Sequence, residues 1–124
     1  MASVPHVLVV EDNPANQLLA ASLLQREGFQ AEVVDCVPEA QRTIDECRPC
    51  LILMDIQLPG EDGLSFALRL KSAPETAEIP VVALTASAMK GDRDRALAAG
   101  CVDYISKPID TRTFGDQIRR ILAS

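Results

Sequence analysis

Short apolar runs that alternate with helical patterns constrain the fold of this chain more than any other feature. Three runs are continuously apolar and two are more mixed: His6–Val10, Cys50–Met54 and Pro80–Leu84, then Ala31–Val34 and Val102–Ser106. A continuous apolar run of this length is typical of a strand that is covered on both faces, as in a parallel sheet. The mixed runs predict outer strands of the same sheet.

Helical patterns separate these strands. The first begins at the cap and proline pair Asn13-Pro14 and ends at Gly28. The others are predicted over Pro38–Arg48, Gly63–Ser72, Ala88–Ala99 and from Asp110 onward, the last with Phe114, Ile118, Ile121 and Leu122 on one face. The alternation predicts an α/β fold, a (βα)₅ doubly wound parallel sheet of five strands with right-handed crossovers. We expect a single domain over residues 1–124.

Composition and charge narrow the classes of function. The chain carries a net charge of −6 and no cluster of lysine and arginine, which argues against nucleic acid as a direct partner. No apolar run approaches the roughly 18 residues that a membrane-spanning helix needs, and the amino terminus lacks the pattern of a signal peptide. We therefore expect a cytoplasmic protein with no membrane association.

Polar side chains gather where the predicted strands end. Glu11-Asp12 follows the first strand, Asp55 the third, Thr85-Ala86 the fourth, and Lys107 the fifth. Ligands of doubly wound sheets bind outside the carboxyl ends of the strands, so these side chains should lie close together. Two carboxylates about 4 Å apart repel by about 4 kcal/mol at an effective dielectric near 20. Oxygen ligands of this kind predict a Mg²⁺ site, or a Mn²⁺ site, on Glu11, Asp12 and Asp55.

The same groups are suited to phosphoryl transfer. A carboxylate such as Asp55 can attack a phosphoryl group and become an aspartyl phosphate. Lys107 would neutralise charge on the phosphoryl oxygens, and the Thr85 hydroxyl would donate a hydrogen bond to them. Backbone N–H groups near Gln57 and Ala86 would complete the phosphoryl-binding cradle.

The motifs together resemble a known family. Glu11-Asp12, Asp55, Thr85-Ala86, Tyr104 and Lys107-Pro108 resemble the receiver domain of two-component response regulators, the CheY-like family. The stretches MDIQLPGEDG and TASAMKGDRDRALAAGCVDYISKPI are similar to DivK-type single-domain receivers and to the receivers of hybrid kinases. The resemblance implies the strand order 2-1-3-4-5.

The resemblance also implies a mechanism. A sensor histidine kinase or a phosphotransfer protein would donate the phosphoryl group to Asp55 in a Mg²⁺-dependent step, with the backbone carbonyl of Gln57 as a further metal ligand. Thr85 and Tyr104 would then move as a switch, and the Lys107–Pro108 peptide bond would be cis. The signal would pass to a downstream protein target through the surface of the fourth helix, fifth strand and fifth helix.

Several alternatives stay open at this point. Gln57 and Ser87 would line the path of the hydrolytic water, so the lifetime of the phosphoryl group is not fixed by the resemblance. An aspartate-nucleophile phosphatase would usually carry a second aspartate at the position of Gln57. A receiver taken from a hybrid histidine kinase and a binding module that is never phosphorylated are further possibilities. The chain stops soon after the last helix, which favours a stand-alone receiver, either a monomer or a weak homodimer.

Overall fold

Parallel strands and helices alternate along the chain. The computed structural model describes residues 5–58, 62–86 and 90–123. The strands are β1 (His6–Val10), β2 (Gln30–Val34), β3 (Leu51–Asp55), β4 (Val81–Thr85) and β5 (Asp103–Ser106). The helices are α1 (Pro14–Arg26), α2 (Val37–Glu46), α3 (Gly63–Ser72), α4 (Lys90–Ala98) and α5 (Phe114–Ala123).

The strands form one sheet in the order β2-β1-β3-β4-β5, and all four pairings are parallel. The predicted fold class and strand order are therefore confirmed. The register pairs Val10 with Met54, so Glu11, directly after β1, lies level with Asp55 at the end of β3. Thr85 pairs with Ser106 in the same way at the end of β4. The carboxyl ends of four strands consequently meet at one edge of the sheet.

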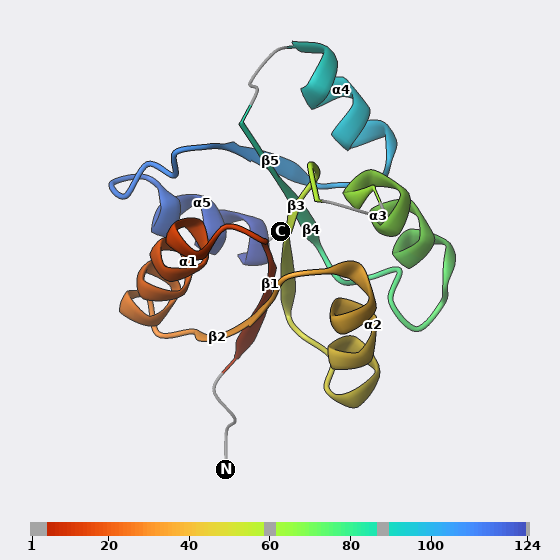
Figure 1. Cartoon of the computed structure of the whole chain (residues 1–124), viewed down its shortest axis with the longest axis horizontal. Helices are drawn as coiled ribbons and strands as arrows, with labels where there is room; N and C mark the ends of the chain where they lie inside the picture. Colours follow the sequence, from red (N-terminus) through yellow and green to blue (C-terminus); the bar gives the residue numbers. More distant parts are fainter. Residues whose placement is uncertain (1–4, 59–61, 87–89, 124) are drawn as a thin grey trace.

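Helices cover both faces of this sheet, as Figure 1 shows, with α1 and α5 on one side and α2 and α3 on the other. Each side has its own apolar core. Phe114 and Ile118 pack with residues of α1 on the first side, and Phe66 packs with residues of α2 and α4 on the second. Phe66 and Phe114 are the largest fully buried side chains in the described part of the chain, so each core has one fully buried aromatic residue among aliphatic ones.

Most bounds of the elements differ from the predicted ones by one or two residues, but α5 begins at Phe114, four residues after the predicted start at Asp110. β3 and β4 each begin and end one residue later than expected, so they include Asp55 and Thr85. Backbone pairing continues past the last apolar side chain, because Asp55 still pairs with Leu84. α2 ends at Glu46, since a residue before a proline avoids the helical conformation and Pro49 lies close behind.

Of the predicted helix over Ala88–Ala99, the first two residues lie outside the described part of the chain. Among the residues that the structure does describe, no helix combines the length and the apolar character needed to cross a membrane.

Candidate functional site

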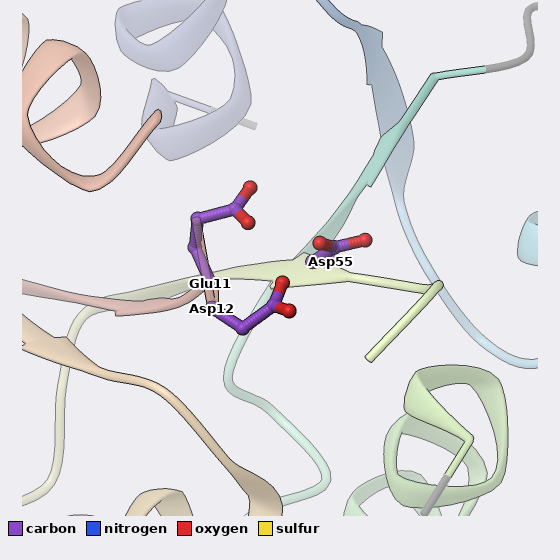
Figure 2. A group of neighbouring side chains, drawn as sticks. All are labelled: Glu11, Asp12 and Asp55. Atoms are coloured by element: carbon purple, nitrogen blue, oxygen red, sulfur yellow. The ribbon is translucent and has the colours of Figure 1, made fainter. Parts of the chain in front are cut away.

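Three carboxylates meet at the carboxyl edge of the sheet. Glu11 and Asp12 come directly after β1, and Asp55 is the last residue of the adjacent strand β3 (Figure 2). One carboxylate oxygen from each residue lies within 4.8 Å of the others. Glu11 and Asp55 are buried, whereas Asp12 is exposed. The structure thus brings together the three acidic residues that the sequence placed at strand ends.

Lys107 joins this acidic cluster from the loop after β5. Its Nζ donates a hydrogen bond to Asp55 Oδ2 at 2.9 Å and lies 2.6 Å from Glu11 Oε1. The Lys107 backbone N–H donates to the carbonyl of Thr85 at 2.8 Å, which fixes the loop against the end of β4. The Lys107–Pro108 peptide bond is cis.

Burial and charge shift the titration of this cluster. Burial raises the pKa of the Glu11 carboxyl and nearby Asp55 adds to the effect, although hydrogen bonds from Lys107 and the Asn13 N–H oppose it. Burial alone would lower the pKa of Lys107, but its bonds and charge interactions with Glu11 and Asp55 outweigh burial and raise it. A single ammonium therefore balances one of three negative charges.

The oxygens of the acidic cluster differ in how they are held. Glu11 Oε2 accepts from the Asn13 N–H at 3.0 Å, and Asp55 Oδ1 accepts from the Gln57 N–H at 2.8 Å. Glu11 Oε1 is buried next to the Lys107 ammonium, yet it accepts no well-directed hydrogen bond in the described part of the chain. The Lys107 ammonium pairs with this oxygen as a salt bridge at 2.6 Å while it also donates to Asp55. The ammonium thereby compensates the buried oxygen, and the charge of the acidic cluster as a whole is what it cannot offset.

The donor set fits a divalent cation. Within the described residues the Asp12 carboxylate takes part in no hydrogen bond or ion pair. The three carboxylates and one ammonium leave an uncompensated charge of about −2 within a few ångströms, which is unfavourable without a cation. Carboxylate oxygens are the ligands that Mg²⁺ and Mn²⁺ prefer. Glu11, Asp12 and Asp55 could hold such an ion.

Thr85 and Tyr104 lie on the strands beside this cluster. Thr85 ends β4 and is buried, and Ala86 follows it at the surface. Tyr104, on β5, is half-buried, and the Arg93 guanidinium of α4 stands over its ring at 5.7 Å from the centroid. A cavity of about 490 Å³ borders Tyr104 between β5, α5 and Arg93. The predicted role of Ser87 lies outside the described residues.

The structure adds three contributors that the sequence reasoning did not find. The Gln17 side-chain amide of α1 donates to the Glu11 carbonyl at 2.6 Å. Gly63 lets α3 approach β3, since a Cβ at that position would lie 2.5 Å from the Asp55 carbonyl oxygen. Arg93 covers Tyr104. A glutamine one turn after a helix cap is the only local signal among these, and it does not reveal which carbonyl the amide would meet.

Comparisons with known proteins point to one family. The family model of the response regulator receiver domain matches residues 7–119. The chain is 44% identical over 116 residues, 94% of each chain, to the polar-differentiation response regulator DivK of Brucella anthropi. It is 43% identical to the DivK protein of Brucella ovis over the same share of each chain.

Solved structures of a receiver domain and of a response regulator are also similar to this chain. The receiver domain of a sensor histidine kinase from Pseudomonas aeruginosa superposes with a TM-score of 0.88 at 34% identity, over 98% of this chain and 100% of that one. That crystal structure holds a magnesium ion coordinated in its active-site cleft. A response regulator structure from Chloroflexus aurantiacus superposes with a TM-score of 0.93 at 25% identity, over 98% and 100% of the two chains.

Proposed function

The chain belongs to the response regulator receiver domain family, and we propose that it is a signalling switch controlled by phosphorylation of Asp55. Receiver domains are signalling regulators of two-component systems and not classical enzymes. The observation that carries the proposal is the contact of the Asp55 carboxylate with Lys107, beside two further carboxylates, at the carboxyl edge of the sheet. The donor would be a histidine kinase or a phosphotransfer protein that carries phosphohistidine.

The transfer step follows from the groups at this edge. An oxygen of Asp55 attacks the phosphorus, a new O–P bond forms, and the N–P bond of the phosphohistidine breaks so that the imidazole leaves. Lys107 stays beside Asp55 and neutralises negative charge on the phosphoryl oxygens. Thr85 contributes its hydroxyl, and the backbone N–H groups of Gln57 and Ala86 provide further donors. Positioning and charge neutralisation are the main contributions that a protein makes to this chemistry.

Glu11, Asp12 and Asp55 would hold Mg²⁺ or Mn²⁺, with the Gln57 backbone carbonyl as a further ligand. A bound divalent ion would supply positive charge that offsets the repulsion between the carboxylates and the incoming phosphoryl group. The position of the exposed Asp12 carboxylate beside Glu11 and Asp55, and the net charge of the acidic cluster, support this assignment. The magnesium ion in the structure of the Pseudomonas receiver, at 34% identity, supports it as well.

Phosphorylation would be transmitted through Thr85 and Tyr104. Tyr104 borders the cavity between β5 and α5, so a change in its ring position would alter the α4–β5–α5 surface. A downstream protein target would bind this surface, and the protein would act in the cytoplasm as a monomer or weak homodimer with only slow autodephosphorylation. The match over 94% of the DivK proteins supports a single receiver domain over residues 1–124.

Phosphoryl transfer from a labelled donor tests the proposal. A histidine kinase or phosphotransfer protein carrying ³²P-phosphohistidine is incubated with the wild type, Asp55→Asn and Asp45→Asn, in Mg²⁺ and in EDTA. Asp45 is an exposed residue of α2, so it is a matched control. We expect label on the wild type and Asp45→Asn in Mg²⁺ only, and none on Asp55→Asn. Equal labelling of all three would refute the assignment of Asp55.

The conformational response has its own probe. Tyr104 is the only tyrosine in the chain and there is no tryptophan, so intrinsic fluorescence reports this ring alone. Beryllofluoride with Mg²⁺, which imitates the phosphoryl group on an aspartate, should change the fluorescence of the wild type and not that of Asp55→Asn. An unchanged spectrum in both would contradict the switch. Repeated turnover of a small phosphomonoester would instead indicate a phosphatase.

A further inference from the structure

Asp12 is the least constrained member of the acidic cluster. It is exposed, and its carboxylate has no hydrogen bond or ion pair within the described part of the chain. Glu11, by contrast, is fixed by the Asn13 N–H and by Lys107, and its backbone N–H donates to the Val34 carbonyl at 3.0 Å. The direction of the Asp12 side chain therefore depends on the conformation of its backbone. The peptide unit between Glu11 and Asp12 is the nearest part of that backbone.

One side chain fixes this peptide unit from the carbonyl side. The Gln17 Nε2 donates to the Glu11 carbonyl oxygen at 2.6 Å, a contact that is partly buried. Gln17 is itself held in a capped helix, because its backbone N–H donates to the Asn13 carbonyl at 2.9 Å. The Asn13 side chain in turn accepts from the first turn of α1. The amide therefore reaches the peptide from a rigid element.

We propose that Gln17 is a positioning residue that orients Asp12 toward the divalent ion by fixing the Glu11–Asp12 peptide plane. The inference rests on the proposed metal site and names a residue that supports it from outside the set of ligands. A hydrogen bond to the carbonyl oxygen restrains rotation of the peptide about its flanking bonds, which favours the orientation that keeps the Asp12 carboxylate close to the other two. Without the amide, the carbonyl oxygen of the buried Glu11 loses the donor that sets its direction, and a water molecule that replaced the amide would hold it less firmly.

The expected effect falls on metal affinity more than on stability. Substitution of a group that orients a metal ligand typically weakens binding about 10–100-fold. Gln17 is half-buried and borders an open groove lined by Val33, Val34, Asp35 and Glu39, but the Glu11 carbonyl that it contacts is buried, so loss of the donor also lowers stability somewhat. Gln17→Met keeps the length of the side chain and replaces the carboxamide, with its N–H donors and its oxygen, by an apolar thioether. Gln25→Met, at an exposed position of the same helix, is the matched control.

Mn²⁺ binding to the full chain measures the effect. The electron paramagnetic resonance signal of free Mn²⁺ is titrated with the wild type, Gln17→Met, Gln25→Met, Asp12→Asn and the double variant Asp12→Asn/Gln17→Met, over a range that saturates the weakest binder. We expect Gln17→Met to bind about tenfold more weakly and Gln25→Met to match the wild type. In EDTA, Gln17→Met should lower the melting temperature by a similar amount in the wild-type and Asp12→Asn backgrounds, because the buried Glu11 carbonyl loses its donor in both, and Gln25→Met should melt with the wild type.

The double variant separates positioning from a general structural role. If Gln17 acts through Asp12, its loss should change affinity by less than about twofold when Asp12 is already asparagine. An equal loss in both backgrounds would overturn the proposal, and so would unchanged affinity of Gln17→Met. A wild type that binds no Mn²⁺ would overturn the metal site itself, which distinguishes failure of the proposed function from failure of this inference.

Discussion

Neutralising Asp12 should make the metal-free protein more stable. In the absence of a cation, Asp12 lies close to two other carboxylates, and only one ammonium is present to offset them. Asp12→Asn removes one of these charges and keeps the shape of the side chain. The substitution breaks no hydrogen bond or ion pair of the described residues. Relief of repulsion is therefore its main expected effect on the free energy of unfolding.

The size of the effect follows from the geometry. Two unit charges 4.8 Å apart repel by about 3.5 kcal/mol at an effective dielectric of 20 and by about 0.9 kcal/mol in bulk water. Attraction to Lys107 cancels roughly one of the two repulsions that Asp12 experiences. Because Asp12 is exposed, the remaining repulsion is closer to the value in water. We expect a stabilisation of about 1 kcal/mol, or about 3–5 °C in melting temperature for a chain of this length.

Thermal unfolding in EDTA and in Mg²⁺ measures both consequences. In EDTA at neutral pH, Asp12→Asn should melt above the wild type. At a Mg²⁺ concentration of ten times the dissociation constant, the wild type should gain about 1.4 kcal/mol by mass action. Asp12→Asn lacks a proposed ligand and should gain far less, so its advantage should disappear.

The chain as a whole carries a net charge of −6, so removal of any negative charge reduces its overall repulsion. The control must therefore remove one negative charge at a position away from the acidic cluster. Glu75→Gln removes one exposed carboxylate in the turn before β4, at the opposite edge of the sheet. Its melting temperature should stay close to that of the wild type. If Asp12→Asn melts no higher than Glu75→Gln in EDTA, repulsion within the acidic cluster is not the cause, and the electrostatic argument for a cation is wrong.

Two further substitutions test the packing of the fold. Gly63→Ala would place a Cβ 2.5 Å from a backbone carbonyl oxygen of β3, so urea unfolding should show that the free energy of unfolding falls by about 1–3 kcal/mol. Gly91 has open space around it, so Gly91→Ala should cause no such loss. Equal stabilities of the two variants would contradict the close approach of α3 to β3. Burial raises the pKa of the Cys101 thiol to about 11 from 9.0, so the stability that this thiol contributes is complete below pH 9 and is lost as the pH rises toward 11. Between pH 8 and 11 the free energy of unfolding of the wild type should therefore fall by about 2 kcal/mol more than that of Cys101→Val. Cys47 is exposed, so Cys47→Val should follow the wild type. Parallel losses in all three proteins would count against the burial of Cys101.

The sequence predicted the elements because their signals are local. A continuous apolar run such as Leu51–Met54 indicates a buried strand, whatever lies elsewhere in the chain. Asn13-Pro14 marks the start of α1, and the structure shows the predicted cap, since the Asn13 side chain accepts from two backbone N–H groups of the first turn. The predicted end of α2, at Arg48, lies two residues beyond the observed end at Glu46, because Pro49 disfavours the helical conformation in the residue before it.

The candidate site was only partly accessible from the sequence. Polar residues at strand ends could be found by pattern, and the rule for doubly wound sheets placed them at one edge. The strand order, in contrast, came from the family resemblance, because apolar periodicity does not say which strands are neighbours. Arg93 over Tyr104 illustrates the limit. The apolar residues of α4 are interrupted by a run of charged residues, 92–95. This pattern does not indicate which of its arginines would lie over the Tyr104 ring.

The sequence by itself thus determined the alternation of strands and helices, and the chemical types of the groups at the strand ends. Only the tertiary structure decided that Lys107 contacts Asp55, 52 positions earlier in the chain, together with Glu11, and that Gln17 fixes the peptide between the two acidic residues. The physical reason is that local structure depends on neighbours along the chain. The contacts of the site depend on which strands are adjacent and on the register between them.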